Sequence, residues 1–263
     1  MVFLILTMRI FIYIIIVCVL VVAAVGSTIA LMLRYRAAWH AATRESERLR
    51  NKEIDWPELK FYKDTNAGLP TVGPNRVVFI GDSITQRWNL TKLFPELEAI
   101  NRGIGWQTTS EMLVRLRQDV IDLHPVAVII LGGSNDFQVA SGPMPLASTQ
   151  NNIRSMVELA RQHGITVLVG TIPPVCFENA KFSRREFTVE SVDRYNEWLR
   201  TFCTGEECTL VDYDAALRNS GQPICAYMPD GIHPREAGYG VMAQAARKAL
   251  NRSTATWSRS RGH

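Results

Sequence analysis

Short apolar runs alternate with amphipathic stretches through most of the chain, and one much longer apolar run stands near its start. The short runs are rich in branched residues, which predicts buried strands at residues 77–80, 126–131, 165–169 and 209–211. Residues 98–102, where Ala99 and Ile100 are apolar, lead into Gly103 and Gly105 and predict a further strand end. Apolar residues at helical spacing predict helices around residues 108–123, 153–160, 192–202 and 241–249. Strands that alternate with helices predict a parallel sheet covered on both faces, a three-layer αβα domain.

The long apolar run covers residues 2–33 with few interruptions. From Ile10 to Leu33 it exceeds the roughly 20 residues that span a bilayer, which predicts one transmembrane helix. We expect residues 1–34 to be a membrane anchor, with the membrane as a partner through residues 10–33. A cleaved signal peptide is the alternative, with a poor cleavage site at Ala24-Val25-Gly26. The uncleaved anchor is favoured because the run continues past that site.

The rest of the chain divides by composition. Residues 35–74 are first mixed and charged and then rich in glycine and proline, which predicts a stalk and a linker. Residues 75–251 carry the alternating pattern and form the predicted domain. Residues 252–263 are polar and basic, and we expect a disordered tail.

Charge and cysteine content narrow the partners and the compartment. The formal net charge is +4, and the surplus lies in the segment after the apolar run and in the tail. Basic flanks favour membrane-surface contact or solubility, so no nucleic-acid partner is expected. The cysteines lack zinc-type spacing, and neither a metal nor another cofactor is expected. Cys203 and Cys208 flank a turn and can form a disulfide only in an oxidising compartment; two free thiols are the alternative.

The orientation in the membrane is set by two opposing signals. Arg34 and Arg36 outnumber Arg9, which by itself would place the domain in the cytoplasm. Large domains can be translocated across the membrane regardless of charge, and the possible disulfide favours a location outside the cytoplasm. We therefore expect an extracytoplasmic domain.

Side chains suited to acyl transfer follow the strands or precede the last helix. Ser83 follows the first strand, at the edge where ligands bind in such sheets. His233 is a candidate base because imidazole titrates near neutrality, and Asp230 lies close enough to orient its ring. The backbone N–H of Ser83, a backbone N–H in the Gly105-Trp106 turn and the Asn135 amide are candidate oxyanion donors.

Each of these signals has a structural alternative. Gly-Asp-Ser can be an ordinary turn, Asn135 a helix cap, and Asp230 with His233 a capped helix start. Trp88 and Phe137 can line an acyl pocket, although core packing is the default for such residues. The order of the signals along the chain makes their combination more specific than any one of them.

Four sequence blocks stand in order along the chain: Gly81-Asp82-Ser83-Ile84-Thr85, Asn101-Arg102-Gly103-Ile104-Gly105, Gly133-Ser134-Asn135-Asp136 and Asp230-Gly231-Ile232-His233-Pro234. They resemble the blocks of the SGNH (GDSL-type) hydrolases. The similarity covers residues 75–250 and is greatest to the bacterial lysophospholipase-like esterases. The resemblance implies a flavodoxin-like fold and metal-free hydrolysis of esters or thioesters through an acyl-enzyme. It implies Ser83 as nucleophile, His233 as base, Asp230 as its partner, and an oxyanion hole formed by Ser83, the second-block turn and Asn135.

One position departs from the family pattern. The second block commonly ends in a glycine whose N–H serves the oxyanion, and this chain has Trp106 there, after Gly105. A tryptophan keeps its backbone N–H, while its bulk would narrow the pocket. The sequence therefore favours small acyl groups.

The sequence thus predicts a membrane-anchored esterase with a small-molecule or lipid ester substrate. Lysophospholipids, acetylated sugars and small acyl esters all remain open, as does the oligomeric state. A non-catalytic glycan- or lipid-binding module on the same fold is the main alternative. A flavin or nucleotide binder is a third, and Asp82 is poorly suited to a phosphate cradle.

Overall fold

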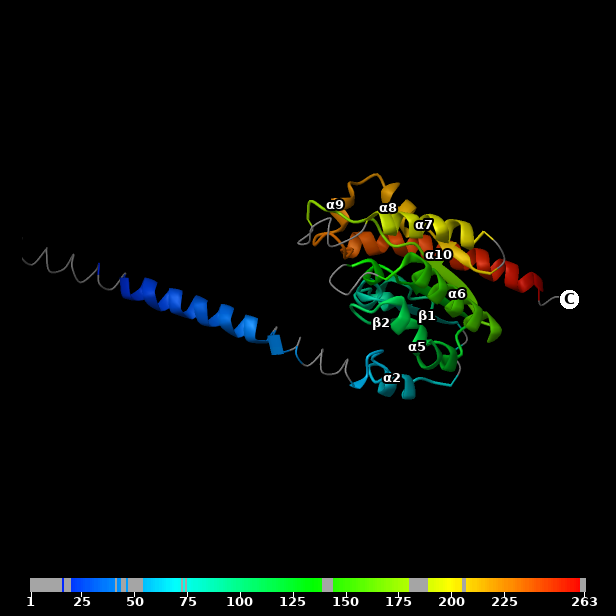
Figure 1. Cartoon of the computed structure of the whole chain (residues 1–263), viewed down its shortest axis with the longest axis horizontal. Coiled ribbons are helices and arrows are strands. Elements are labelled where there is room, and N and C mark those ends of the chain that lie inside the picture. Colours follow the sequence, from blue (N-terminus) through cyan, green and yellow to red (C-terminus); the bar gives the residue numbers. More distant parts are fainter. Residues whose placement is uncertain are drawn as a thin grey trace, which may run out of the picture. The chain divides into compact units, whose positions relative to one another are not determined.

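The computed structural model describes residues 20–40, 54–71, 73, 75–138, 144–179, 189–204 and 207–260, together with Ile16, Ala42, Thr43 and Ser46. The chain forms two compact units, Met1–Asp55 and Trp56–His263, which are described separately (Figure 1).

The first unit contains a helix over Leu20–His40. By its length and composition this helix can cross a membrane, and a signal sequence would have the same character. The hydroxyls of Ser27 and Thr28 donate to backbone carbonyls one turn earlier, so neither adds an unpaired polar group to the apolar surface. Most of the predicted span before Leu20, and most of the charged stretch after Thr43, lie outside the described residues.

The second unit is built on a five-stranded parallel sheet in the order β2-β1-β3-β4-β5. This is the flavodoxin-like order, and it confirms the predicted sheet. The strands are β1 (Arg76–Gly81), β2 (Glu98–Gly103), β3 (Ala127–Leu131), β4 (Thr166–Gly170) and β5 (Thr209–Val211).

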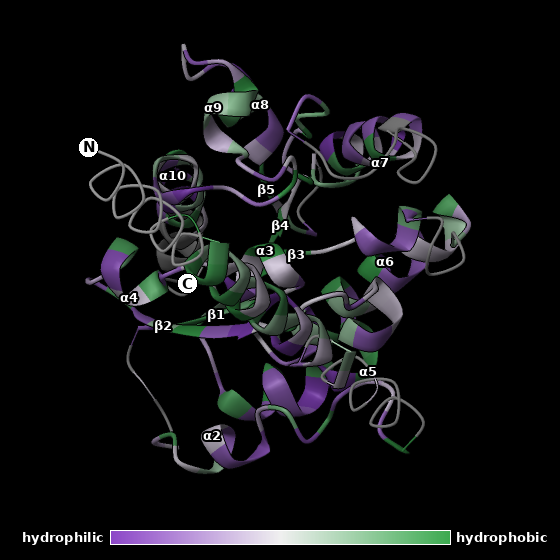
Figure 2. Ribbon diagram, turned by 90° about the vertical axis from the view of Figure 1, so that its left-hand side faces the viewer, coloured by the Kyte–Doolittle hydropathy of each residue, from purple (hydrophilic) through white to green (hydrophobic). Residues whose placement is uncertain are grey.

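Helices cover both faces of the sheet. Alternate residues of β1 and β3 belong to two different apolar clusters, one on each face. The cluster with Val78 and Val128 packs under α5 (Thr109–Asp119), α6 (Leu146–Gln162) and α7 (Val189–Phe202). The other face is covered by α3 (Ser83–Gln86), α4 (Leu90–Leu93), α8 (Tyr213–Arg218), α9 (Ile224–Tyr227) and α10 (Glu236–Ser260). Figure 2 shows α10 and the group α5, α6 and α7 on opposite sides of the strands.

Strand register brings the sequence blocks to one edge. Gly81, the last residue of β1, pairs with Gly103 of β2 and with Leu131 of β3. The turns that follow these three strands therefore start side by side, as the carboxyl ends of parallel strands must.

The C-terminal segment differs from the predicted disordered tail. Residues 252–260, which were expected to be disordered, continue α10 to Ser260. No glycine or proline interrupts the sequence between Gly240 and Gly262, so no breaker ends the helix. The Ser253 hydroxyl also donates to Thr209 Oγ1 at 2.9 Å, which ties the helix to β5. Residues 261–263 lie outside the described part.

The segment before β1 belongs to the same unit as the sheet. It contains α2 (Lys63–Ala67), and the Tyr62 hydroxyl donates to the Gly103 carbonyl at 2.6 Å. Its glycines and prolines are typical of a linker, yet its polar side chains bind the edge of the sheet. The boundary at residue 75 stays a prediction, and the structure groups residues from Trp56 onward with the sheet.

Four of the five cysteines form disulfide bonds. Cys203 pairs with Cys208, the pairing that the sequence left open, and Cys176 pairs with Cys225. The second bond joins residues 49 positions apart, so no local turn signal could indicate it.

Candidate active site

Ser83, His233 and Asp230 form a continuous hydrogen-bonded line. Ser83 is the first residue of α3, and Asp82 caps that helix by accepting the Ile84 N–H at 2.9 Å. Ser83 Oγ lies 2.8 Å from His233 Nε2, and His233 Nδ1 lies 2.8 Å from Asp230 Oδ2. The structure therefore joins a hydroxyl and an imidazole that are 150 positions apart in sequence.

The loop before α10 holds Asp230 in this position. Asp230 Oδ1 accepts the backbone N–H groups of Ile232 at 3.1 Å and His233 at 2.8 Å. Burial raises the pKa of Asp230, but the hydrogen bonds from His233 and Ile232 outweigh it and lower the pKa to about 2. The carboxylate is therefore ionised near neutral pH and accepts a hydrogen bond from Nδ1–H. In neutral imidazole this tautomer leaves the lone pair of Nε2 facing the Ser83 hydroxyl.

Arg87 is a member of the site that the sequence did not indicate. Its Nη1 lies 3.3 Å from Asp230 Oδ2, the same oxygen that binds His233, and the two side chains are 54% and 40% exposed. The Arg87 N–H donates to the Ser83 carbonyl at 3.1 Å, so Arg87 lies one helical turn beyond Ser83. The only sequence feature that could have pointed to Arg87 is its spacing of four residues from Ser83, which places the two residues one helical turn apart. A surface ion pair of this kind typically contributes less than about 1 kcal/mol.

The second block forms a tight turn against Ser83. The Gln107 N–H donates to the Ile104 carbonyl at 3.4 Å, and Trp106 between them has a φ of 69°. Turns with a positive φ at this position favour glycine, and a larger residue costs about 1–3 kcal/mol. Trp106 is 58% exposed. The Gly105 N–H donates to Gln86 Oε1 at 3.0 Å, and a Cβ on Gly105 would lie 3.7 Å from that of Ser83.

Asn135 lies beside that turn. It is buried at the start of a 3₁₀ helix, Asn135–Phe137, and its Nδ2 donates to the Gln107 carbonyl at 2.9 Å. Gly133, two residues earlier, has a φ of 113°, a conformation that glycine adopts without strain. Ser134 Oγ donates to Asp82 Oδ2 at 2.5 Å and so connects the third block to the first.

The remaining motif residues support these turns. Burial raises the pKa of both Asp82 and Asp136, although each carboxyl group accepts hydrogen bonds that lower it. Asp136 accepts the Thr109 N–H at 3.0 Å, which links the third block to the start of α5. A Cβ on Gly103 would lie 2.1 Å from Gln86 N, so only glycine lets β2 approach α3 so closely. Thr108 and Glu111 form a capping box at that start of α5.

Several side chains play no direct part in the line from Ser83 to Asp230. Trp88 and Phe137 are both buried in the apolar clusters, so core packing holds for them.

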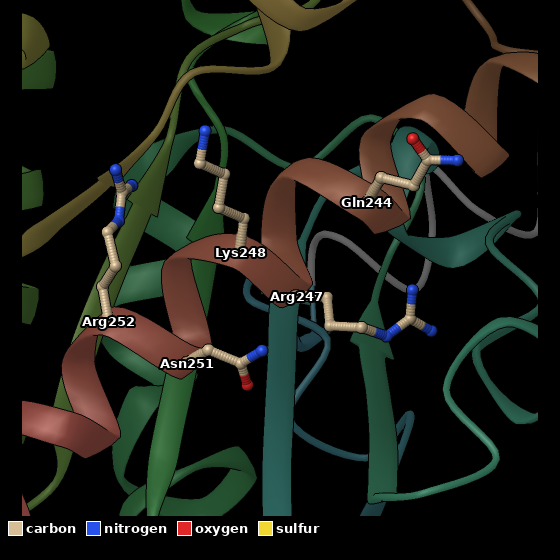
Figure 3. Close-up of a pocket in the computed structure, with 5 residues that line it drawn as sticks. All are labelled: Gln244, Arg247, Lys248, Asn251 and Arg252. Atoms are coloured by element: carbon tan, nitrogen blue, oxygen red, sulfur yellow. The ribbon is translucent and has the colours of Figure 1, made fainter.

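A hollow of about 560 Å³ on α10 is lined by Gln244, Arg247, Lys248, Asn251 and Arg252 (Figure 3). None of the residues that line this hollow was predicted from the sequence to be catalytic or to bind the oxyanion. Among the described residues, no group of three or more His, Cys, Asp or Glu is arranged to hold a metal ion.

Comparison with known proteins identifies the family of this domain. The model of the GDSL-like Lipase/Acylhydrolase family matches residues 79–241. A GDSL-like lipase from Bacteroides thetaiotaomicron VPI-5482 superposes with a TM-score of 0.67 and is 28% identical, over 75% of this chain and 99% of that one.

Two curated relatives extend the comparison. The platelet-activating factor acetylhydrolase IB subunit alpha1 of Bos taurus is 27% identical over 191 residues, 67% of this chain and 75% of the relative. The uncharacterized lipoprotein YqeF of Bacillus subtilis (strain 168) is 32% identical over 134 residues, which are 44% of this chain and 55% of the lipoprotein.

Proposed function

The chain belongs to the GDSL-like lipase/acylhydrolase family and is an ester-hydrolysing enzyme, and from this premise we propose that it cleaves carboxylic esters through an acyl-enzyme on Ser83. The observation that carries the proposal is the line from Ser83 Oγ through the His233 ring to Asp230, with 2.8 Å at both contacts. A serine hydroxyl is a weak nucleophile by itself, and an adjacent oriented base activates it.

The proposed reaction has two halves. Ser83 Oγ attacks the ester carbonyl carbon while its proton passes to His233 Nε2, and Asp230 stabilises the imidazolium that forms. The tetrahedral intermediate collapses, the C–O bond to the alcohol breaks, and His233 returns the proton to the leaving oxygen. A water molecule then attacks the acyl-enzyme with His233 again as base, which releases the carboxylic acid and restores the Ser83 hydroxyl.

The proposed oxyanion site has three hydrogen-bond donors. We assign this role to the backbone N–H groups of Ser83 and Trp106 and to Asn135 Nδ2. The Gly105 N–H is directed to Gln86, which favours Trp106 as the donor of the second block. One such donor contributes about 3–4 kcal/mol in the transition state.

The substrate class follows from Trp106 and from one relative. We propose that the bulk of Trp106, next to the glycine that lies against Ser83, narrows the space for the acyl group, and the bovine relative is named an acetylhydrolase. We therefore propose small acyl groups, acetyl above all, on an alcohol that can belong to a lysophospholipid, a sugar or another small molecule.

Replacing Trp106 with glycine is expected to shift the preference toward longer acyl chains. Glycine relieves the strained backbone and removes the indole that is proposed to limit the acyl chain, so kcat/KM for p-nitrophenyl octanoate relative to acetate should rise about tenfold, the scale of one methylene contact. The replacement of exposed Val114 with glycine serves as a comparison on α5. An unchanged ratio in Trp106→Gly would remove Trp106 from the specificity argument.

The function itself is tested with the full chain in detergent or nanodiscs. Release of p-nitrophenol from p-nitrophenyl acetate and butyrate should show an initial burst of one equivalent per active site, because with this good leaving group the acyl-enzyme forms faster than water hydrolyses it. Ser83→Ala is the control. Equal rates in the two proteins would contradict the proposal and favour a binding module on the same fold.

We also propose that the domain works outside the cytoplasm, held by the Leu20–His40 helix. The two disulfide bonds favour an oxidising compartment, and the similarity to a lipoprotein favours membrane attachment. Alkaline phosphatase fused after His263 should be active, and green fluorescent protein at the same position should be dark. The reverse pattern would place the domain inside the cell.

A further inference from the structure

A buried pair of polar side chains, Gln107 and Arg115, lies behind the second-block turn. Both are fully buried. Arg115 Nε donates to Gln107 Oε1 at 2.5 Å, and Arg115 Nη2 donates to the carbonyls of Gly81 at 3.0 Å and Arg102 at 2.8 Å. Arg115 Nη1 also pairs with Asp119 at 3.0 Å. One guanidinium thus joins the ends of β1 and β2 to the side chain that follows Trp106.

The other side of Gln107 binds the segment that leads into the domain. Gln107 Nε2 donates to the Pro57 carbonyl at 2.9 Å and approaches Glu58 Oε2 at 3.2 Å. Five residues later, the Tyr62 hydroxyl donates to the Gly103 carbonyl. Residues 57–62, which we call the brace, therefore hold both ends of the second-block turn.

Gln107 also fixes the amide of Asn135. Its carbonyl accepts one N–H of Asn135 Nδ2 at 2.9 Å. The two N–H bonds of a planar amide diverge at a fixed angle, so holding one of them sets the direction of the other. A displacement of Gln107 would move two of the assigned oxyanion donors together, the Trp106 N–H and the Asn135 amide.

We propose that Gln107 is the positioning residue of the oxyanion site and that the brace holds it in place. This inference rests on the proposed function of Ser83, and it adds residues 57–62 to the active site. A tryptophan keeps a left-handed backbone conformation, such as the φ of 69° at Trp106, only where the surrounding structure holds it there. The hydrogen bonds of Gln107 to Ile104, Arg115 and Pro57 supply that restraint.

The test compares two variants that each lose a hydrogen bond to the brace. Gln107→Met removes the bonds to Pro57 and Arg115, whereas Gln118→Met removes the bond from Gln118 Nε2 to the Leu59 carbonyl, 2.6 Å long, without touching the turn. Misplacement of a reacting group by about 1 Å can cost 10²-fold. We expect kcat of Gln107→Met to fall about 10- to 100-fold with KM within about twofold, and Gln118→Met to retain both values.

A second measurement separates positioning from loss of folding. Phenylboronic acid forms a tetrahedral adduct with a serine and places an oxygen in the oxyanion site, so its inhibition constant should rise in parallel with the loss of kcat. Tyr62→Phe, a milder change that removes only one hydroxyl from the brace, should show the same pattern at a few-fold scale. The thermal midpoint is recorded for every variant, and rates are compared below it.

The outcomes are distinct. Folded Gln107→Met with kcat and boronate inhibition within twofold of wild type would overturn the proposal, and so would an equal kcat loss in Gln118→Met. Failure of the proposed reaction would show separately, as hydrolysis that survives Ser83→Ala.

Discussion

Replacing His233 with alanine is expected to lower kcat for ester hydrolysis by about 10⁶-fold, and Ser83→Ala by a similar factor. The Ser83 proton has no other acceptor in the line that the structure shows, because His233 Nε2 is the atom 2.8 Å from Oγ. The two side chains act as a unit, so the double variant should lose no more activity than either single variant. Initial rates with p-nitrophenyl acetate at saturating substrate, corrected for spontaneous hydrolysis, measure the loss.

The matched control for this prediction is His163→Ala. His163 is an exposed histidine at the end of α6 and takes no part in the site, so its variant should retain the wild-type rate. A His233→Ala protein that keeps more than about one part in a hundred of kcat would show that another group removes the Ser83 proton, since an intact base typically contributes more than that.

Asp230→Asn is expected to lower kcat by about 10⁴-fold. An asparagine amide can donate to Nδ1, which would favour the tautomer with the proton on Nε2, the wrong atom for a base facing Ser83. It also removes the negative charge that stabilises the imidazolium. Arg87→Gln is the informative comparison, because it removes the other side-chain partner of Asp230 Oδ2. This partner is largely exposed, so a change of less than about threefold is expected.

The pH dependence of the Asp230 variant has a definite sign. Hydrogen bonds hold the pKa of Asp230 at about 2, below the ordinary value, so the carboxylate is charged throughout the range above about pH 4. The variant should therefore be slower than wild type at every pH from about 4 to 9, with no pH at which the two rates meet. The contribution of the Asp230 carboxylate to the free energy of unfolding is likewise present above the pKa that Asp230 has in the unfolded chain. It is lost only as pH falls toward about 2, the pKa in the folded protein. Convergence of the two rates near pH 5 would contradict this assignment.

Local signals in the sequence were sufficient to predict the parallel sheet and the positions of the four sequence blocks at its edge. Four strands were indicated by short apolar runs, β2 by Ala99 and Ile100 before its closing glycine, and α5 by apolar residues at helical spacing. Ser83, Asn135 and His233 could be selected because each stands in a turn whose place at the sheet edge follows from topology. The family resemblance then supplied roles for them that the spacing of the residues alone did not fix.

The features that the sequence missed depend on contacts between distant residues. Gln107 and Pro57 are 50 positions apart, and the Cys176–Cys225 bond spans 49. Arg87 joins the site only because the loop that carries Asp230 folds back onto α3. The short helices α8 and α9 are too brief for a periodic pattern, and for residues 252–260 the polar composition was given more weight than the absence of glycine and proline.

The separation of Ser83 from His233 also has a consequence during synthesis. A ribosome makes the first strand early, but the imidazole emerges 150 residues later, just before the final helix that seals one face of the sheet. On the proposed mechanism, a growing chain therefore carries the Ser83 hydroxyl without its base, and it gains the ability to cleave esters only when the segment with His233 has folded onto the sheet. Nascent or prematurely terminated products should thus be harmless to the acylated molecules around them.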